Sequence, residues 1–525
     1  MLGRVAGVCA FLMALASWGR PLGSGETAVD VVHPGDVCTF LVEAAAGTAL
    51  SLRVDHGHLD LAIRVRGPDG ETVGVMENTL RRTDPLTLTA VTDHEGTQRV
   101  EIWLRSPRAR SGQIRVTLGQ MGPATAADAL RLSAQALRAQ GDEVVAAQDA
   151  AHYPDALDGY ARSVALWAQA GDETQRAETL TRKGELLEAM GRLPQARTTL
   201  EEALRSWDAV ADRTREADCR GVLGLVTTEL GAPREAVSLI EQALAVRRSV
   251  APLPAAEAVL LNFLAVALGN LGDLSGAVDR YTEALTFARE DADPELTALV
   301  LKNRAMDLEQ LGESRRALAD LYEARDTFRA LGNVSEQGHS EYGEGIALEH
   351  LGQTGESWRA FQRALPLFER SGEARFVAFT LNHLGLLRLS TGKPDQAREL
   401  FLQSLQRLEA NGDRRSAVHL RVNLARTLIA SGRAAEAVAP LAAGREELHA
   451  IGDRVQEAIC LTELARAELI TGHLLEARRH VLEALQLTEE LRGSITGPSA
   501  RAAYAAVVHE RHELLAGVLM ALHTR

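Results

Sequence analysis

At 525 residues the chain is too long for a single hydrophobic core, so at least two folded units are expected. Its formal net charge of −14, with no long basic run, argues against nucleic acid or an anionic membrane surface as the main partner. The four cysteines form no CxxC pair, and Cys9 lies near the N-terminus, so neither a disulfide framework nor a zinc site is expected.

The N-terminus has the pattern of an export signal. Arg4 precedes the apolar run Val5–Ala16, which ends in small residues suited to cleavage. This run is too short to cross a bilayer as a helix, and no other segment is expected to do so. We therefore predict a signal peptide within residues 1–25 and a secreted or periplasmic protein. An uncleaved anchor or a misassigned start codon remains open.

Residues 26–120 alternate between apolar and polar side chains over short runs. Such alternation predicts half-buried strands. The runs cover residues 39–43, 49–54, 60–65, 86–91, 99–104 and 113–118, and turn sequences at 67–70 and 93–96 separate some of them. Short strands at this spacing predict a small antiparallel β-sandwich.

This stretch resembles the pre-peptidase-like β-sandwich of secreted bacterial proteins. The matching features are Leu59-Asp60-Leu61, the turn Gly67-Pro68-Asp69-Gly70 and Gly96 ahead of the strand at 100–102. The resemblance implies an accessory module. His56 and His58 are more readily interpreted as loop histidines than as metal ligands, and a metal- or sugar-binding role for the sandwich stays open.

From about residue 125 the pattern becomes helical and repeats. Glycine recurs at 191, 231, 272, 312, 352, 392, 432 and 472, which is a spacing of 40 with one step of 41. A small residue stands seven positions before each glycine: Gly184, Gly224, Ala265, Ala305, Gly345, Gly385, Ala425 and Ala465. A large residue stands nine positions after it: Leu200, Ile240, Tyr281, Leu321, Phe361, Phe401, Leu441 and Val481.

These columns predict stacked helical hairpins. The small residue lets two helices approach, the large residue is expected to fill the gap against the neighbouring hairpin, and the glycine takes the left-handed turn that ends the first helix. Pro194, Pro233 and Pro394 are expected to open second helices, and Pro440 should kink one. A second marker, at Gly171, Ala211, Gly332, Gly372, Gly412 and Gly452, is expected to close the hairpins.

The columns resemble the tetratricopeptide repeat (TPR), with a unit longer than the usual one. The predicted fold is mainly α: a TPR-type α-solenoid of about nine hairpins over residues 125–490, preceded by the β-sandwich of residues 26–120. Capping or linker helices are expected over residues 491–525.

The tail resembles the linker helices that follow the repeats in bacterial CHAT-domain proteins, which join TPR arrays to a caspase-like cysteine peptidase. The matching residues are Leu491-Arg492, Arg501-Ala502-Ala503-Tyr504 and Leu519–His523. The resemblance implies the regulatory portion of such a peptidase, whose catalytic domain is absent from this chain. A generic capping helix is the alternative.

No catalytic, metal or cofactor motif is evident, and we expect no enzyme activity and no cofactor. Cys219 and Cys460 are expected to be buried structural thiols. The segment His509–His512 lacks the HExxH spacing and is expected to be a solvated helix face, and His473 and His480 are expected to be exposed.

The place expected for function is the face formed by the first helices, because first helices line the concave groove of TPR proteins and bind peptides there. Six residues at two repeat positions are candidates: Asn262, Lys302, Tyr342, Asn382, Arg426 and Arg466. Asparagine side chains can bond a peptide backbone, and Lys302 can meet a carboxylate. The alternative is that the asparagines are merely solvated.

The sequence thus predicts a non-catalytic secreted scaffold that binds a peptide or protein. The alternative is the regulatory part of a CHAT-type peptidase, with a peptidase domain or subunit as partner.

Overall fold

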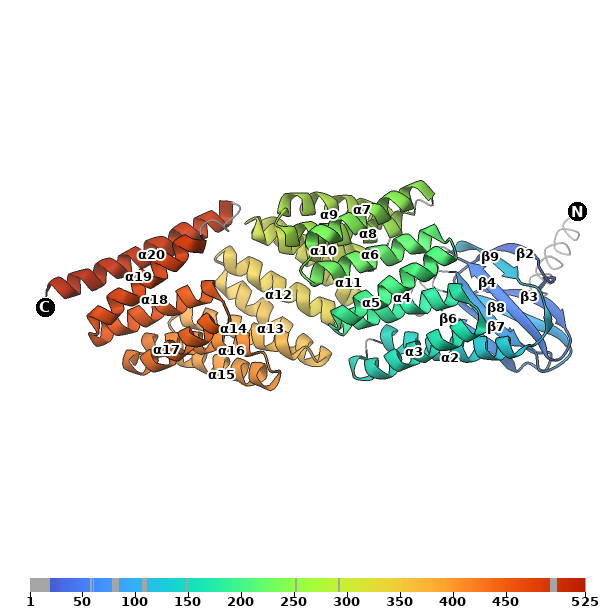
Figure 1. The fold of residues 1–525 in the computed structure, drawn as a ribbon, viewed down its shortest axis with the longest axis horizontal. Helices are drawn as coiled ribbons and strands as arrows, with labels where there is room; N and C mark the ends of the chain where they lie inside the picture. Colours follow the sequence, from blue (N-terminus) through green and yellow to red (C-terminus); the bar gives the residue numbers. More distant parts are fainter. Residues whose placement is uncertain are drawn as a thin grey trace, which may run out of the picture. The chain divides into compact units, whose positions relative to one another are not determined.

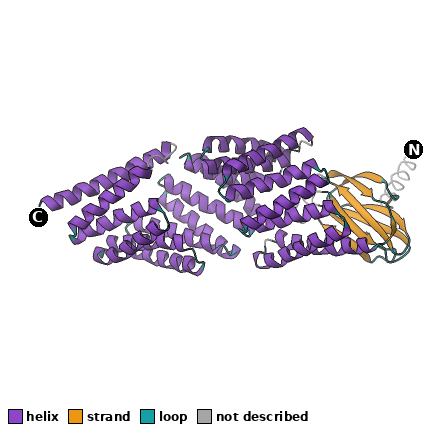
Figure 2. Ribbon diagram, in the orientation of Figure 1, coloured by secondary structure: helices purple, strands orange, loops and turns teal. Residues whose placement is uncertain are grey.

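The computed structural model describes residues 19–56, 59, 61–77, 85–105, 111–147, 149–250, 253–290, 293–491 and 498–524. The predicted leader run at 5–16, His58 and Asp60 lie outside these residues. The chain divides into two compact units, Met1–Val246 and Arg247–Arg525, and each is described separately. Figures 1 and 2 show that strands form the N-terminal part and helices the remainder.

The strands form two five-stranded sheets, which are antiparallel apart from the short parallel pair β1–β3. One sheet has the order β1-β3-β8-β5-β6, and the other has the order β10-β4-β9-β2 with β7 paired to β4. The strands are β1 (Arg20–Pro21), β2 (Thr27–Val32), β3 (Val37–Ala44), β4 (Thr48–Asp55), β5 (Leu61–Arg66), β6 (Thr72–Glu77), β7 (Leu86–Val91), β8 (Gly96–Leu104), β9 (Gly112–Leu118) and β10 (Gly122–Pro123).

The alternation of apolar and polar residues along the strands places the apolar side chains in the core of this sandwich. On β4, Leu50, Leu52 and Val54 are fully buried, whereas Ser51 and Arg53 between them are exposed. Inward residues of both sheets, such as Phe40, Ile63 and Ile102, complete one cluster. The predicted sandwich is therefore present.

Four strands were not predicted: β1, β2, β6 and β10. β1 and β10 contain only two residues each, too few to show a period. In β2, Val29 and Val31 face outward and are 42% and 44% exposed, so the hydrophobic pattern does not mark the buried side. β1 falls within the range expected for the leader and pairs with β3 at Phe40 and Leu41.

In the described part of the chain, the helices follow as nine hairpins in chain order and a final helix. The first helices are α2 (Ala126–Ala146), α4 (Glu173–Ala189), α6 (Arg213–Glu229), α8 (Pro254–Leu271), α10 (Pro294–Gln310), α12 (Val334–His350), α14 (Ala374–Ser390), α16 (Arg414–Ala430) and α18 (Arg454–Thr471). The second helices are α3 (Tyr153–Ala170), α5 (Leu193–Ala209), α7 (Pro233–Val250), α9 (Leu274–Glu290), α11 (Ser314–Leu331), α13 (Thr354–Ser371), α15 (Pro394–Ala410), α17 (Ala434–Ala450) and α19 (Leu474–Leu491). The short 3-10 helix η1 (Ala150–His152) precedes α3, and α20 (Pro498–His523) comes last.

The packing columns behave as predicted. A Cβ on Gly385 would overlap the buried ring of Phe401, and a Cβ on Gly184 would overlap Leu200 in the same way. The small residue is therefore what lets the first helix of a hairpin rest against the large residue of the second.

The loops also follow the predicted signals. All eight repeat glycines have a positive φ, for example 69° at Gly191 and 84° at Gly472. The second marker does too, including Ala211 at 57°, which is the one non-glycine residue with a positive φ in the described part of the chain. Asp172, Asp212 and Asp413 follow this marker and cap the next helix by accepting a backbone N–H.

The prolines open helices as expected: Pro233 and Pro394 are first residues of α7 and α15, and Pro194 is the second residue of α5. Pro440 lies inside α17, and Pro366, which was not singled out, lies inside α13. Both prolines fall within continuous helices.

Two predictions about exposure were wrong. His480 is only 5% exposed, and its Nδ1 lies 2.8 Å from a carboxylate oxygen of Glu468. The segment His509–His512 is not wholly solvated, because Arg511 is 4% exposed and donates to the hydroxyl groups of Thr462 and Thr488. Arg511 thereby fastens α20 to α18 and α19, a contact that a helix-surface pattern does not reveal.

Among the described residues, one helix is apolar enough to cross a membrane by length and composition alone. This helix is α8, with a mean hydropathy of 1.5 over an 18-residue window, half of which is buried inside the protein. It packs against α9 and α10 in the solenoid. A packed core helix passes this test as well, so the expectation that no segment besides the leader crosses a membrane stays a prediction.

Candidate functional site

The candidate residues lie on the first helices of the second unit, where α10 lies beside α8 and α12, and α16 lies beside α14 and α18. We call the surface formed by α8, α10, α12, α14, α16 and α18 the first-helix face. Each candidate occupies the same side of its helix as its counterparts in neighbouring repeats, because the repeat register holds.

Two asparagine pairs join neighbouring first helices. Asn303 on α10 donates its Nδ2 to Oδ1 of Asn262 on α8 at 3.1 Å. Asn423 on α16 donates in the same way to Asn382 on α14 at 2.9 Å. Both pairs are separated by 41 residues, one repeat and one position. Sequence reasoning selected Asn262 and Asn382 and missed their partners.

The two pairs differ in exposure. Asn262 is only 4% exposed, so its amide serves mainly its neighbour. Asn382 and Asn423 are both partly exposed. Arg426, another candidate, donates to Oδ1 of Asn423 at 3.3 Å and lies 3.3 Å from Glu463. The second pair therefore leaves amide groups that a ligand can reach.

Lys302 and Arg466 are engaged in ion pairs. Lys302 Nζ lies 2.6 Å from Glu336 on α12. Arg466 contacts Glu463 at 3.4 Å and Glu510 on α20 at 2.6 Å. These cations meet carboxylates, as proposed for Lys302, but the carboxylates belong to the chain itself.

Tyr342 belongs to an aromatic cluster between α12 and α14. Its ring makes edge contacts with Phe361 at 5.5 Å, Phe376 at 5.8 Å and His383 at 5.5 Å. Burial raises the pKa of Tyr342 above its ordinary value. The ring thus acts first as packing between two repeats, with part of its surface exposed.

A carboxylate beside this cluster is held ionised. Glu373, which precedes α14, accepts from Ser335 and Ser371 at 2.7 Å each and lies 2.8 Å from His339. Burial alone would raise the pKa of Glu373, but the hydrogen bonds from His339, Ser335 and Ser371 outweigh it and lower the pKa to about 2.

The first helices of the first unit carry the opposite arrangement. Glu188 on α4 and Glu229 on α6 are hydrogen-bonded carboxyl groups. Burial and the neighbouring Glu229 raise the pKa of Glu188 to about 7. Burial raises the pKa of Glu229 as well.

Two cysteines fit the structural interpretation. Cys219 and Cys460 are fully buried, and each Sγ faces the backbone oxygen of the large-column residue one helix earlier, Leu200 or Leu441. Burial raises the pKa of both thiols to about 12, which disfavours the nucleophilic thiolate. Within the described residues, no group of three or more His, Cys, Asp or Glu side chains is placed to hold a metal ion.

Comparison with known proteins identifies the repeats. A family model for the tetratricopeptide repeat matches residues 175–249 and 338–410. Protein FlbA from Caulobacter vibrioides is 29% identical over 140 residues, which are 27% of this chain and 21% of FlbA. The match thus spans about a fifth of the length of that relative.

Two solved structures are similar to this chain at low identity. The apo form of RapI is 11% identical, with a TM-score of 0.51, over 66% of this chain and 97% of RapI. A Rap protein complexed with Competence and Sporulation Factor is 13% identical, with a TM-score of 0.44, over 66% of this chain and 99% of that one. The chain therefore carries tetratricopeptide repeats, arranged as a TPR-type solenoid behind a two-sheet β-region.

Proposed function

We propose that the protein is an exported, non-catalytic scaffold that binds an extended peptide or protein segment along the first-helix face of its second unit. The observation that carries this proposal is the pair Asn382–Asn423, which joins α14 and α16 and remains partly exposed. TPR proteins are interaction modules, which supports a protein or peptide as partner.

A side-chain amide matches a peptide bond, because each offers one carbonyl acceptor and N–H donors. The Oδ1 of Asn382 is occupied by Asn423, so the Nδ2 of Asn382 is left to donate to a ligand carbonyl. The pair fixes the amide orientation before binding, which lowers the entropy lost on association.

The charges on the same helices indicate the kind of segment that fits. α14 and α16 contain six arginines and no Asp or Glu within their bounds. Arg375 and Arg415 contact Asp413 and Asp453, yet their side chains are 66% and 68% exposed. They can therefore meet further carboxylates, and the bound segment should carry acidic side chains.

A library of blocked extended peptides tests the proposal on the full chain. We expect acidic peptides to be enriched. The double variant Asn382→Ala, Asn423→Ala should lower the affinity for the selected peptide about tenfold or more, because two hydrogen bonds from side-chain amides to the peptide are lost. Asn411→Ala, an exposed asparagine at the end of α15, is the matched control. Equal affinity of both variants for the peptide would exclude the first-helix face.

Arg426, Arg466, Lys302 and Tyr342 extend the same test. Single alanine variants should weaken binding less than the asparagine pair, because three of these side chains are already in ion pairs and Tyr342 packs against other rings. Asn262→Ala should affect stability more than affinity.

Export is a separate part of the proposal and rests on the run Val5–Ala16. Mass spectrometry of the mature protein in the producing cell checks it. A mature N-terminus just after Ala16, in the exported fraction, is the expected result; an intact Met1 in the cytosolic fraction would contradict it.

The second candidate function is the regulatory portion of a CHAT-type peptidase. It rests on the resemblance of the tail, of which Leu519–His523 falls within α20. The DNA that follows the coding region decides it: a caspase-like reading frame there would favour this function, and its absence would remove its main support.

A further inference from the structure

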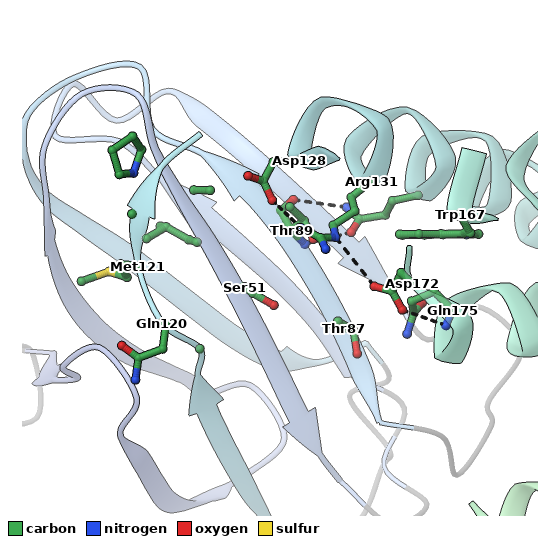
Figure 3. Close-up of a pocket in the computed structure, with 16 residues that line it drawn as sticks. Ser51, Thr87, Thr89, Gln120, Met121, Asp128, Arg131, Trp167, Asp172 and Gln175 are labelled. Carbon is green, nitrogen blue, oxygen red and sulfur yellow. Dashed lines mark hydrogen bonds and ion pairs between the residues drawn. The ribbon is translucent and has the colours of Figure 1, made fainter. Parts of the chain in front are cut away.

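A cavity of about 490 Å³ lies in the first unit, between the β-sandwich and the first helices. Its floor is the outer surface of β4 and β7, and its walls come from the segment 119–123 and from α2, α3 and α4. Figure 3 shows Ser51 and Thr87 projecting from the strands, with Trp167 and Gln175 across from them on helices. This volume falls in the range of sites for small molecules, roughly 300–1,000 Å³.

The walls are held in place by specific bonds. On β7, the backbone N–H of Thr89 donates to Oε1 of Gln135 on α2 at 2.9 Å, and Gln135 returns a bond to the Thr89 carbonyl at 3.5 Å. This side-chain amide replaces a neighbouring strand at the edge of β7. α2 is therefore fixed against the sheet, and the cavity beside it is a preformed feature.

Glycine keeps part of the wall open. A Cβ on Gly119 would lie 3.3 Å from the backbone oxygen of Ser51. The chain can therefore pass close above β4 before it turns along the cavity at Gln120 and Met121.

Hydroxyl and amide groups on the floor and wall are available to a ligand. Among the described residues, the hydroxyls of Ser51 and Thr87 have no hydrogen-bond partner, and the same holds for Nε2 of Gln120, whose Oε1 accepts a 3.4 Å bond from Ser24. All three residues line the cavity. They offer both donors and acceptors without carrying a charge.

The charged groups of the cavity favour a neutral ligand over an anionic one. Asp128 and Asp172 flank Arg131, at 2.7 and 3.9 Å, which leaves a formal charge of −1 from these three residues. An anionic ligand would be repelled, and a lipid chain would leave the hydroxyls and amides unsatisfied. The partly exposed thioether of Met121 supplies limited apolar surface, and Trp167, only 2% exposed, adds the edge of its indole.

We propose that this cavity binds a neutral saccharide of about disaccharide size. A sugar presents hydroxyls that donate and accept at once, which suits Ser51, Thr87 and Gln120. It also carries small apolar C–H patches, which match the limited apolar surface of Met121. The proposal does not depend on peptide binding by the first-helix face, because all lining residues belong to the first unit.

Calorimetry on the full chain tests the proposal with cellobiose, maltose and N,N′-diacetylchitobiose at millimolar concentrations. We expect saturable binding of at least one. Ser51→Ala and Thr87→Val should each weaken it about fivefold, the effect of one lost neutral hydrogen bond. Thr286→Val, which removes an exposed hydroxyl on α9, is the matched control and should not change affinity.

Saturation-transfer NMR on the wild-type chain supplies a readout that does not depend on the variants, and circular dichroism checks that each variant is folded. Magnetisation transfer to the sugar, reduced in both variants, supports the proposal. Three results would overturn it: no binding of any probe, unchanged affinity in Ser51→Ala and Thr87→Val, or tighter binding of a sulfated disaccharide than of the neutral ones.

Discussion

The two segments that match the TPR family model, residues 175–249 and 338–410, are alike in packing and unlike on their exposed first-helix surfaces. In both, a glycine meets a large buried side chain: Gly184 meets Leu200, and Gly385 meets Phe401. On and beside the first helices, however, one segment sets Glu188 against Glu229, whereas the other sets Glu373, at the start of α14, against His339.

This difference teaches that the repeat pattern specifies how helices stack and leaves the exposed face free to vary. The packing columns hold across both segments because a change there costs stability. The exposed positions carry like charges in one segment and a complementary network in the other, so they distinguish what each segment can bind.

The largest effect should come from removing the large residue of each hairpin. Phe401→Ala should lower the free energy of unfolding by about 3–5 kcal/mol and Leu200→Ala by about 2–5 kcal/mol, since both side chains are fully buried. Urea denaturation followed by circular dichroism measures both. If only one of the two positions were sensitive, the claim of shared packing would fail.

A smaller effect is expected from adding a methyl group to the glycines. Gly385→Ala and Gly184→Ala should each destabilise by about 1–2 kcal/mol, because overlap with the neighbour exceeds the gain in helix propensity. Phe401→Leu should partly rescue Gly385→Ala, since Ala425 already stands opposite Leu441 at the same positions one repeat later. A double variant no more stable than Gly385→Ala would argue against direct contact.

The two carboxylates should respond to pH in opposite directions. The pKa of Glu188 in the folded state is about 7, above the ordinary 4.5, so its protonated form stabilises the fold at low pH. That contribution is lost as pH rises from 4.5 to 7. Glu188→Gln should remove about 1 kcal/mol of this pH dependence, measured by urea denaturation across that range.

For Glu373 the sign is reversed. Its pKa in the folded state is about 2, below the ordinary 4.5, so its contribution is present above pH 4.5 and is lost as pH falls toward 2. In Glu373→Gln, the free energy of unfolding should therefore fall by about 1 kcal/mol less than in wild type as pH is lowered from 4.5 to 2. Near neutral pH, its dependence on pH should match that of wild type. If the free energy of unfolding depended on pH in both variants as it does in wild type, the claimed electrostatic difference between the two segments would be wrong.

The smallest effect concerns the loop between α5 and α6. Ala211 has a φ of 57°, at a position where five other hairpins carry glycine, such as Gly372 at 76°. Ala211→Gly should stabilise the fold by about 0.5–1 kcal/mol, since relief of the left-handed conformation outweighs the entropy of glycine in the unfolded chain. A thermal melt checks it, with Ala209→Gly at the end of α5 as a destabilising control.

The hairpins could be predicted from the sequence because the same packing residues recur in each repeat. Gly184, Gly191 and Leu200 have counterparts at fixed distances in the other repeats, which chance matches would not produce. The sandwich was predicted less completely. β2 exposes Val29 and Val31, and β1 and β10 are too short to show alternation.

The candidate site was predicted only in part, for a physical reason. Position in the repeat identified Asn382, but its partner Asn423 stands one position later in its own repeat, so a strict register missed it. Burial of His480 and Arg511 depends on contacts with Glu468 and with Thr488, which no local spacing encodes. The sandwich cavity joins residues about 120 positions apart, as Ser51 and Gln175 do, and left no sequence signal.

The most direct test of the central claim is NMR of the side-chain amides during titration with the acidic peptide selected from the library. Binding along the first-helix face predicts that the Nδ2–H signals of Asn382 and Asn423 shift and become protected from exchange, while those of Asn411 do not. Saturable peptide binding with both signals unmoved would contradict it.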